Sequence, residues 1–183
     1  MNNRNRVCPV ELSRSLDNNI RKWLQNPIKI LNPYIKEGMT VLDVGCGPGF
    51  FTVPIAELVG SRGKVIAADL QDGMLQKLSM KIKGTELEDR VVFHKCETDK
   101  IGFKDKVDLI LAFYMVHEVP NKENFLKELK SILNFNGLIF IVEPKFHVSK
   151  NEFNKMVKFA ESIGLKTIEQ SRLFFSRSVV LKN

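Results

Sequence analysis

Three glycines at alternate positions, Gly45, Gly47 and Gly49, follow a short apolar segment that contains Asp43. Glycine admits backbone angles closed to other residues and lets a ligand approach the main chain, so this spacing predicts a tight turn with a ligand lying on it. A dinucleotide loop would need a further glycine at Phe50, and a P-loop would need Lys and then Ser or Thr after the last glycine. Asp43 suits a cationic ammonium better than a pyrophosphate.

Residues 41–49 and the motifs after them resemble the class I S-adenosylmethionine-dependent methyltransferases, in particular the small-molecule branch with the ubiquinone and menaquinone methyltransferases. The resemblance covers about residues 26–145. It implies that S-adenosylmethionine is the cofactor, and that its methionine end lies on Asp43, Gly45, Cys46 and Gly47.

Asp69 closes the next apolar segment, 26 residues after Asp43. This is close to the spacing at which a carboxylate reaches ribose hydroxyls in related sheets. By the resemblance, Asp69 binds both ribose hydroxyls, and Leu70 or Met74 packs against adenine.

Residues 91–103 resemble the family segment that usually holds an aspartate against the adenine amino group. Glu97 occupies that place, and Asp99 competes for it two residues later. Thr98 and Cys96 flank Glu97 and are expected to offer backbone contacts or packing.

Residues 107–119 are similar to the family's fourth-strand motif, after which the chain opens toward the transferred methyl group. Ala112 is expected to contact the cofactor through its backbone, with Phe113 and Tyr114 near the sulfonium, where an electron-rich ring face favours a cation. A nucleobase amine methyltransferase would usually show Asn or Asp, two prolines and an aromatic residue here, and that sequence is absent.

Methyl transfer is an in-line displacement for which proximity and alignment matter most, so a general base is optional. If a base acts, His117 is the first choice, and Tyr114 and His147 are further catalytic candidates. For His117, a helix-capping or packing role is an equally weighted alternative to a role as base. The other titratable residues expected on that side are Glu118 and Glu143.

No metal site is expected. His117 and Glu118 would begin an H-E-x-x-H motif, but position 121 is Asn. The three cysteines Cys8, Cys46 and Cys96 are widely spaced, which indicates neither a disulfide framework nor a zinc site. A soft metalloid bound by Cys8 and Cys96 stays open as a minor alternative.

The elements that must position these residues alternate along the chain. Apolar runs predict one strand that begins at residue 41, and further strands at 64–69, 90–95, 107–113, 137–143, 165–169 and 173–181. Helical spacing predicts helices at 11–25, 27–31, 51–59, 71–82, 121–133 and 149–163. This alternation predicts an α/β fold: a Rossmann-like, doubly wound, seven-stranded sheet, mostly parallel with an antiparallel C-terminal hairpin.

One methyltransferase domain is expected over residues 1–183: an N-terminal helical cap (1–36), a cofactor-binding core (37–145) and a C-terminal helix and hairpin (146–183).

Residues 1–36 hold seven basic and two acidic side chains, and residues 145–183 hold eight basic and three acidic side chains. Basic ends favour an anionic acceptor or, less strongly, nucleic acid, although lysine and arginine on exposed helices for solubility explain them as well. Lacking an apolar run of membrane length, the chain is expected to be cytoplasmic.

The leading functional hypothesis is a methyltransferase that acts on a small molecule. An RNA or protein methyltransferase that docks through the basic ends is the second, and a non-catalytic S-adenosylmethionine-binding protein is the third. The acceptor, its reacting atom and the oligomeric state are not set by the sequence.

Overall fold

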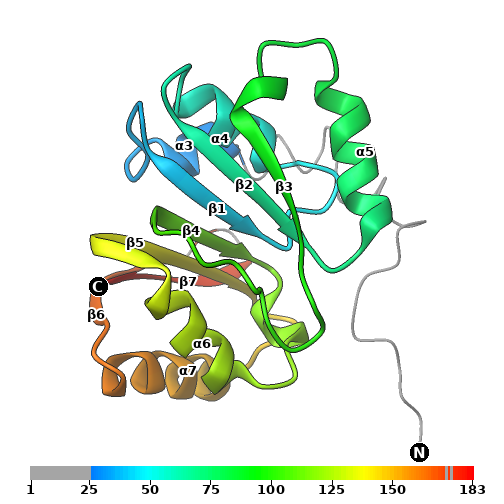
Figure 1. Cartoon of the computed structure of the whole chain (residues 1–183). Coiled ribbons are helices and arrows are strands. Elements are labelled where there is room, and N and C mark those ends of the chain that lie inside the picture. Colours follow the sequence, from blue (N-terminus) through cyan, green and yellow to red (C-terminus); the bar gives the residue numbers. More distant parts are fainter. Residues whose placement is uncertain (1–25, 172, 174) are drawn as a thin grey trace, which may run out of the picture.

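The computed structural model describes residues 26–171, 173 and 175–183. Seven strands form one sheet in the order β3-β2-β1-β4-β5-β7-β6. The strands are β1 (Thr40–Val44), β2 (Lys64–Asp69), β3 (Val91–Lys95), β4 (Val107–Phe113), β5 (Leu133–Pro144), β6 (Lys166–Ser171) and β7 (Ser176–Lys182). Strands β1 to β5 run parallel, whereas β7 is antiparallel to both β5 and β6. The predicted Rossmann-like sheet with an antiparallel C-terminal pair is confirmed (Figure 1).

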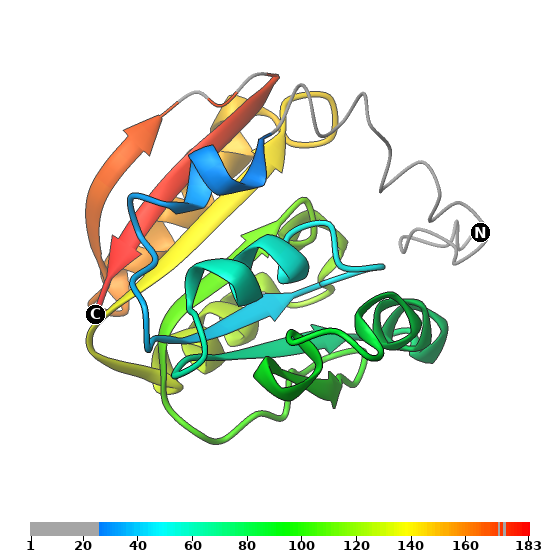
Figure 2. The ribbon, with the colours of Figure 1, turned by 90° about the horizontal axis from the view of Figure 1, so that it is seen from above.

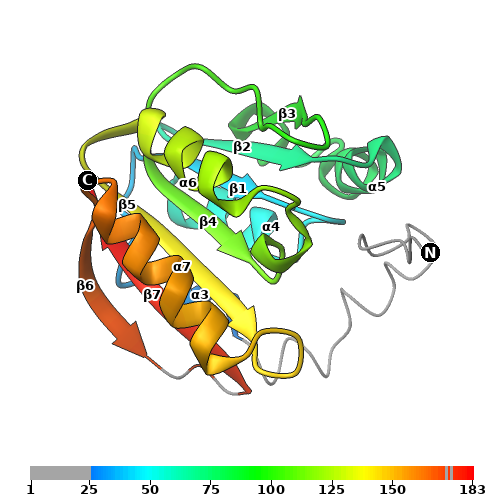
Figure 3. The same ribbon diagram turned by 90° about the horizontal axis from the view of Figure 1, so that it is seen from below.

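Helices cover both faces of this sheet. They are α3 (Pro27–Leu31), α4 (Thr52–Leu58), α5 (Asp72–Ile82), α6 (Lys122–Ser131) and α7 (Lys150–Ser162), with 3-10 turns η2 (Glu88–Arg90) and η3 (Val116–Glu118). Figure 2 shows α3 and α4 in front of one face, and Figure 3 shows α6 and α7 in front of the other. The helix predicted at 11–25 lies outside the described residues.

Two apolar layers hold the sheet between its helices. Alternate residues of a strand point to opposite faces, and in β4 Leu109 and Leu111 pack with the α3 and α4 side, while Ile110 and Ala112 pack with the α6 and α7 side. All four side chains are fully buried. The continuous apolar run of β4 is therefore explained by a strand that is buried on both faces.

Side-chain caps mark the starts of α3 and α7. Ser149 and Glu152 form a reciprocal capping box at the start of α7, with the Ser149 Oγ accepting from the Glu152 N–H at 3.2 Å. Asn26 caps α3, and Pro27 occupies its first position.

Strand β5 begins four residues earlier than the sequence predicts. Leu133 pairs with Val107 ahead of an irregularity in the register, and Asn136 takes a positive φ of 63° before Gly137. The Asn134 side chain donates to Asp108 at 2.7 Å, which ties the early part of the strand to β4. The helical spacing of 121–133 concealed this start, because Leu133 fits either a helix or a buried strand.

Candidate functional site

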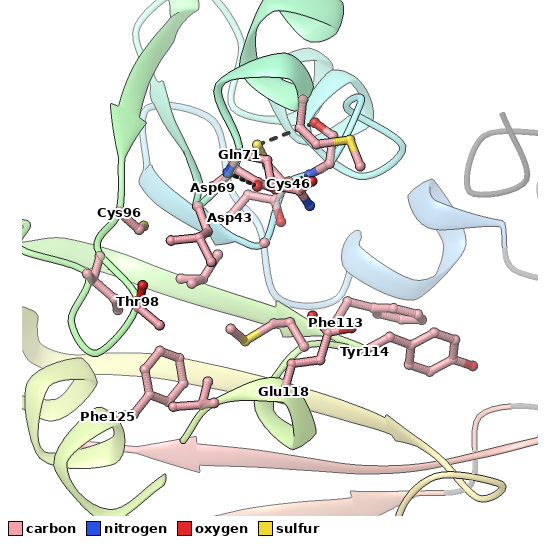
Figure 4. Close-up of a pocket in the computed structure, with 18 of the residues that line it drawn as sticks. Asp43, Cys46, Asp69, Gln71, Cys96, Thr98, Phe113, Tyr114, Glu118 and Phe125 are labelled. Carbon is pink, nitrogen blue, oxygen red and sulfur yellow. Dashed lines mark hydrogen bonds between the residues drawn. The ribbon is translucent and has the colours of Figure 1, made fainter. Parts of the chain in front are cut away.

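A cavity of about 650 Å³ opens at the carboxyl ends of β1, β2 and β4. This volume lies within the range of about 300–1,000 Å³ typical of small-molecule sites, and the position is where ligands bind in open parallel sheets. Figure 4 shows its walls, with Asp43 and Asp69 on one side and Glu118 and Phe125 on the other.

The glycine turn forms the cavity wall next to β1. Gly45, Gly47 and Gly49 all have positive φ, at 72°, 54° and 88°. A Cβ on Gly49 would lie 2.3 Å from Leu78 Cδ1, whereas a Cβ on Gly47 would meet nothing within 4 Å. A side chain at Gly49 would therefore displace the buried Leu78 side chain of α5, whereas Gly47 leaves open space for a ligand to approach the main chain.

Asp69 fastens the turn to the end of β2. Its Oδ2 accepts the Gly47 N–H at 2.9 Å and its Oδ1 accepts the Gln71 N–H at 2.8 Å. Burial raises the pKa of Asp69, and these backbone donors and nearby Lys95 counteract the rise. Each carboxylate oxygen can accept more than one hydrogen bond, so the side chain can hold the turn and still receive a diol.

Asp43 is buried beneath the turn, with 3% of its surface exposed. The Thr52 hydroxyl donates to its Oδ2 at 2.6 Å. Burial raises the pKa of Asp43 to about 7, the Thr52 hydrogen bond opposes this rise, and the charge of Asp69 adds to it. A cationic ligand beside this carboxyl would favour its ionised form.

Aromatic rings run along a neighbouring wall. The centroids of Phe51 and Phe113 lie 4.2 Å apart, those of Phe113 and Tyr114 lie 4.4 Å apart, and Phe50 packs against Phe51. Tyr114 has a positive φ of 61°, a strained conformation for an aromatic residue, and its hydroxyl hydrogen-bonds to the buried Ser176. The positive φ of Tyr114 sets the direction of its side chain, and the hydrogen bond to Ser176 holds the ring at the cavity.

Most of the residues predicted to bind the cofactor line this cavity. They are Asp43, Gly45, Cys46, Gly47, Asp69, Leu70, Met74, Glu97, Thr98 and Phe113, and Tyr114 from the catalytic candidates joins them. Cys46 and Cys96 are free, buried thiols. Ala112 is not among the residues that line the cavity, and its side chain is buried in the α6 and α7 layer, so its backbone contact with the cofactor stays a prediction.

His117 and His147 lie together but not on the cavity wall. Their rings stack with centroids 5.2 Å apart, and His117 Nδ1 lies 2.6 Å from Oε2 of the buried Glu143. Glu143 Oε1 also accepts the Val116 N–H at 2.9 Å. Burial lowers the pKa of His117, but the hydrogen bond and charge of Glu143 outweigh that and leave it raised.

The sequence did not single out the opposite wall. Met115, Glu118, Val119, Pro120 and Phe125 all contribute to it. Phe125 falls within the helix predicted at 121–133 and was given no role there, and Glu118 was expected only as one of several titratable groups. The turn η3 gives these two adjacent residues different surroundings, because it directs the Glu118 side chain to the cavity and the His117 side chain to Glu143.

Comparison with known proteins agrees with this geometry. A family described as a methyltransferase domain matches residues 35–173. The chain is 28% identical over 138 residues to the ubiquinone/menaquinone biosynthesis C-methyltransferase UbiE of Shewanella frigidimarina, covering 75% of this chain and 53% of that protein. It is 27% identical over 124 residues to the demethylmenaquinone methyltransferase of Bacillus cereus, covering 67% and 51%. The chain thus spans about half the length of these curated relatives.

Solved structures share the fold along nearly the whole chain. A SAM-dependent methyltransferase from Aquifex aeolicus superposes with a TM-score of 0.85 at 29% identity, covering 96% of this chain and 99% of that one. A SAM-dependent O-methyltransferase from Thermotoga maritima gives a TM-score of 0.66 at 20% identity, covering 97% and 72%, and shows the fold alone.

This protein belongs to the methyltransferase domain family, in its class I S-adenosylmethionine-dependent group. Its cofactor is S-adenosylmethionine, and the resemblance to the ubiquinone and menaquinone methyltransferases is confirmed. The residues present fit that cofactor, because two buried carboxyls flank a turn whose Gly47 leaves the main chain open. Among the helices of the described ranges, none is long and apolar enough to cross a membrane.

Proposed function

We propose that this protein transfers a methyl group from S-adenosylmethionine to a small-molecule acceptor. One observation carries the proposal: the cavity places Asp43, Asp69 and the open Gly47 backbone on one wall and Phe113 and Tyr114 on another. Carboxylates suit the ammonium and the ribose diol, and ring faces suit the sulfonium.

The cofactor supplies an electrophilic methyl group, so the protein mainly aligns the acceptor and excludes water. In this proposal Asp43 faces the ammonium, Asp69 holds the ribose, and Glu97 or Asp99 at the rim reaches the adenine amino group. The Leu70 or the Met74 side chain supplies the apolar surface for the base.

Tyr114 borders the reacting end of the cavity. His117 and His147 lie beyond it as a stacked pair fixed by Glu143. We assign this pair to the acceptor side, where His117 is either a base or a support for the η3 turn. Among the relatives, UbiE is named as a C-methyltransferase, which makes carbon one candidate for the reacting atom here.

Calorimetry with S-adenosylhomocysteine tests the cofactor site. Labelled methyl transfer into a cell extract, separated into small-molecule, RNA and protein fractions, tests the acceptor class. Label only in RNA or protein would favour the alternative of docking through the basic ends, and binding without any transfer would favour a non-catalytic role. The cytoplasmic location stays a prediction from the sequence.

A further inference from the structure

The described part of the cavity wall is strongly acidic. Its ionisable carboxyl and amino groups are Asp43, Asp69, Glu97, Asp99, Glu118 and Lys100. The ammonium group of Lys100 lies 3.4 Å from the Glu97 carboxylate, which partly neutralises its charge. An acceptor that is itself a carboxylate or a phosphate would meet repulsion along this wall.

Glu118 differs from the other acids in its position. Asp43 and Asp69 lie at the glycine turn and already accept hydrogen bonds there, while Glu97 and Asp99 are exposed at the rim. Glu118 comes from η3, after β4, and lies across the cavity from Asp43 and Asp69 (Figure 4).

The surroundings of Glu118 are poor in hydrogen-bond donors. Val119, Pro120 and Phe125 line the same part of the cavity. The Glu118 carboxyl is half-buried, and within the described ranges no hydrogen bond or ion pair reaches it. A carboxylate that loses water without gaining a donor is unfavourable, so a ligand that brings a donor would relieve this cost.

The charges around Glu118 agree with a carboxyl group that is available to accept a hydrogen bond or a proton from a ligand. Burial raises its pKa to about 7; protonated His117 lowers it, and the carboxylates of Asp69 and Glu143 raise it further. Near neutral pH the group therefore exchanges a proton readily, as a general base should.

We infer that Glu118 contacts the methyl acceptor, and that the acceptor presents a neutral or cationic hydrogen-bond donor, a hydroxyl or an amine, rather than an anionic group. This inference rests on the proposed function. It replaces the anionic acceptor that the basic ends suggested, because Glu118, the carboxyl of the described wall that is neither assigned to the cofactor nor exposed at the rim, carries the opposite charge from the ends of the chain.

The transfer step balances with Glu118 as proton acceptor. A lone pair of the acceptor forms the new bond to the methyl carbon while the carbon–sulfur bond breaks, and its electron pair stays on sulfur to give the neutral thioether. The proton released from the acceptor's O–H or N–H group moves to the Glu118 carboxylate.

The test uses labelled methyl transfer into the small-molecule fraction of a cell extract, followed by separation of the products on anion and cation exchangers at neutral pH. Label should appear in neutral or cationic products. Glu118→Gln should lower the transfer rate about a hundredfold and leave the affinities for S-adenosylmethionine and S-adenosylhomocysteine unchanged. Glu123→Gln, an equal charge change at an exposed position of α6, should alter neither.

The outcomes separate this inference from the proposed function. Label confined to products held by the anion exchanger overturns the inference, and so does unchanged transfer in Glu118→Gln. A loss of S-adenosylmethionine affinity alone would place Glu118 at the sulfonium and would also overturn it. Absence of cofactor binding, or of label in every small-molecule fraction, would refute the proposed function itself.

Discussion

Replacing Asp43 with Asn should make the protein more stable and less able to bind its cofactor. The carboxyl is buried and its charge is not neutralised by a described cation, so ionisation costs free energy in the folded chain. Asn keeps an oxygen that can accept the Thr52 hydrogen bond and removes the charge. Buried charge in a binding site is a common reason for a protein to be less stable than its fold allows.

The size of the effect follows from the pKa of Asp43, which rises from 3.8 to about 7 on folding. Each pKa unit corresponds to 1.36 kcal/mol, so the shift represents at most about 4 kcal/mol. Because the folded pKa is the higher one, the folded state holds the proton more tightly. This contribution to stability is present below pH 3.8 and is lost as the pH rises to about 7.

Urea unfolding of the wild type and of Asp43→Asn at about pH 5 and about pH 8 measures this term. The free energy of unfolding of the variant should exceed that of the wild type by more at the higher pH. Glu118 titrates in the same range and is present in both proteins, so the difference between them isolates Asp43. Asp105→Asn, at an exposed site outside the cavity, serves as the control.

Equal pH dependence in the wild type and Asp43→Asn would refute this reasoning. Thr52→Val provides an independent check, because loss of the hydroxyl that donates to Asp43 should destabilise the protein more at high than at low pH. If Thr52→Val acted equally at both, the hydrogen bond would not be favouring the ionised carboxyl.

Further predictions concern the cofactor wall. Binding of S-adenosylmethionine, followed by calorimetry, should strengthen as the pH rises through about 7, since Asp43 must ionise to meet the ammonium; affinity independent of pH would count against that contact. Asp69→Ala should weaken binding about tenfold or more through lost charge-assisted hydrogen bonds, whereas unchanged affinity would remove Asp69 from the site. Gly49→Ala should destabilise the fold because its Cβ would lie 2.3 Å from Leu78, while Gly47→Ala should cost only about 1–2 kcal/mol of backbone strain and chiefly impair binding. Thermal unfolding measures both glycine variants, and equal losses would contradict the difference in packing.

The sequence predicted the sheet well because its strands carry strong local signals. The apolar runs at 64–69 and 107–113 coincide with β2 and β4, and turn glycines and capping residues mark the elements between them. The meeting of Asp43 and Asp69 at one cavity was also predictable, since they lie at the carboxyl ends of successive strands of a parallel sheet and such ends meet at one edge.

The acceptor wall was less predictable for a physical reason. His117 and Glu118 are adjacent, and both are titratable, but a 3-10 turn directs their side chains apart. No periodicity in the sequence distinguishes the one that lines the cavity from the one that bonds to Glu143. Phe125 shows the same limit, because the spacing of apolar residues along a helix is the same whether a given residue faces the core or a cavity.

The hydrogen bond between Tyr114 and Ser176 joins the site to the antiparallel hairpin. Ser176 is the first residue of β7, which lies between β5 and β6 in the sheet although it comes last along the chain. During synthesis, the cofactor turn leaves the ribosome well before the strand that anchors Tyr114. A nascent chain can therefore form the glycine turn and the ends of β1 and β2 early, but Tyr114 gains its anchor only after β7 has inserted beside β5.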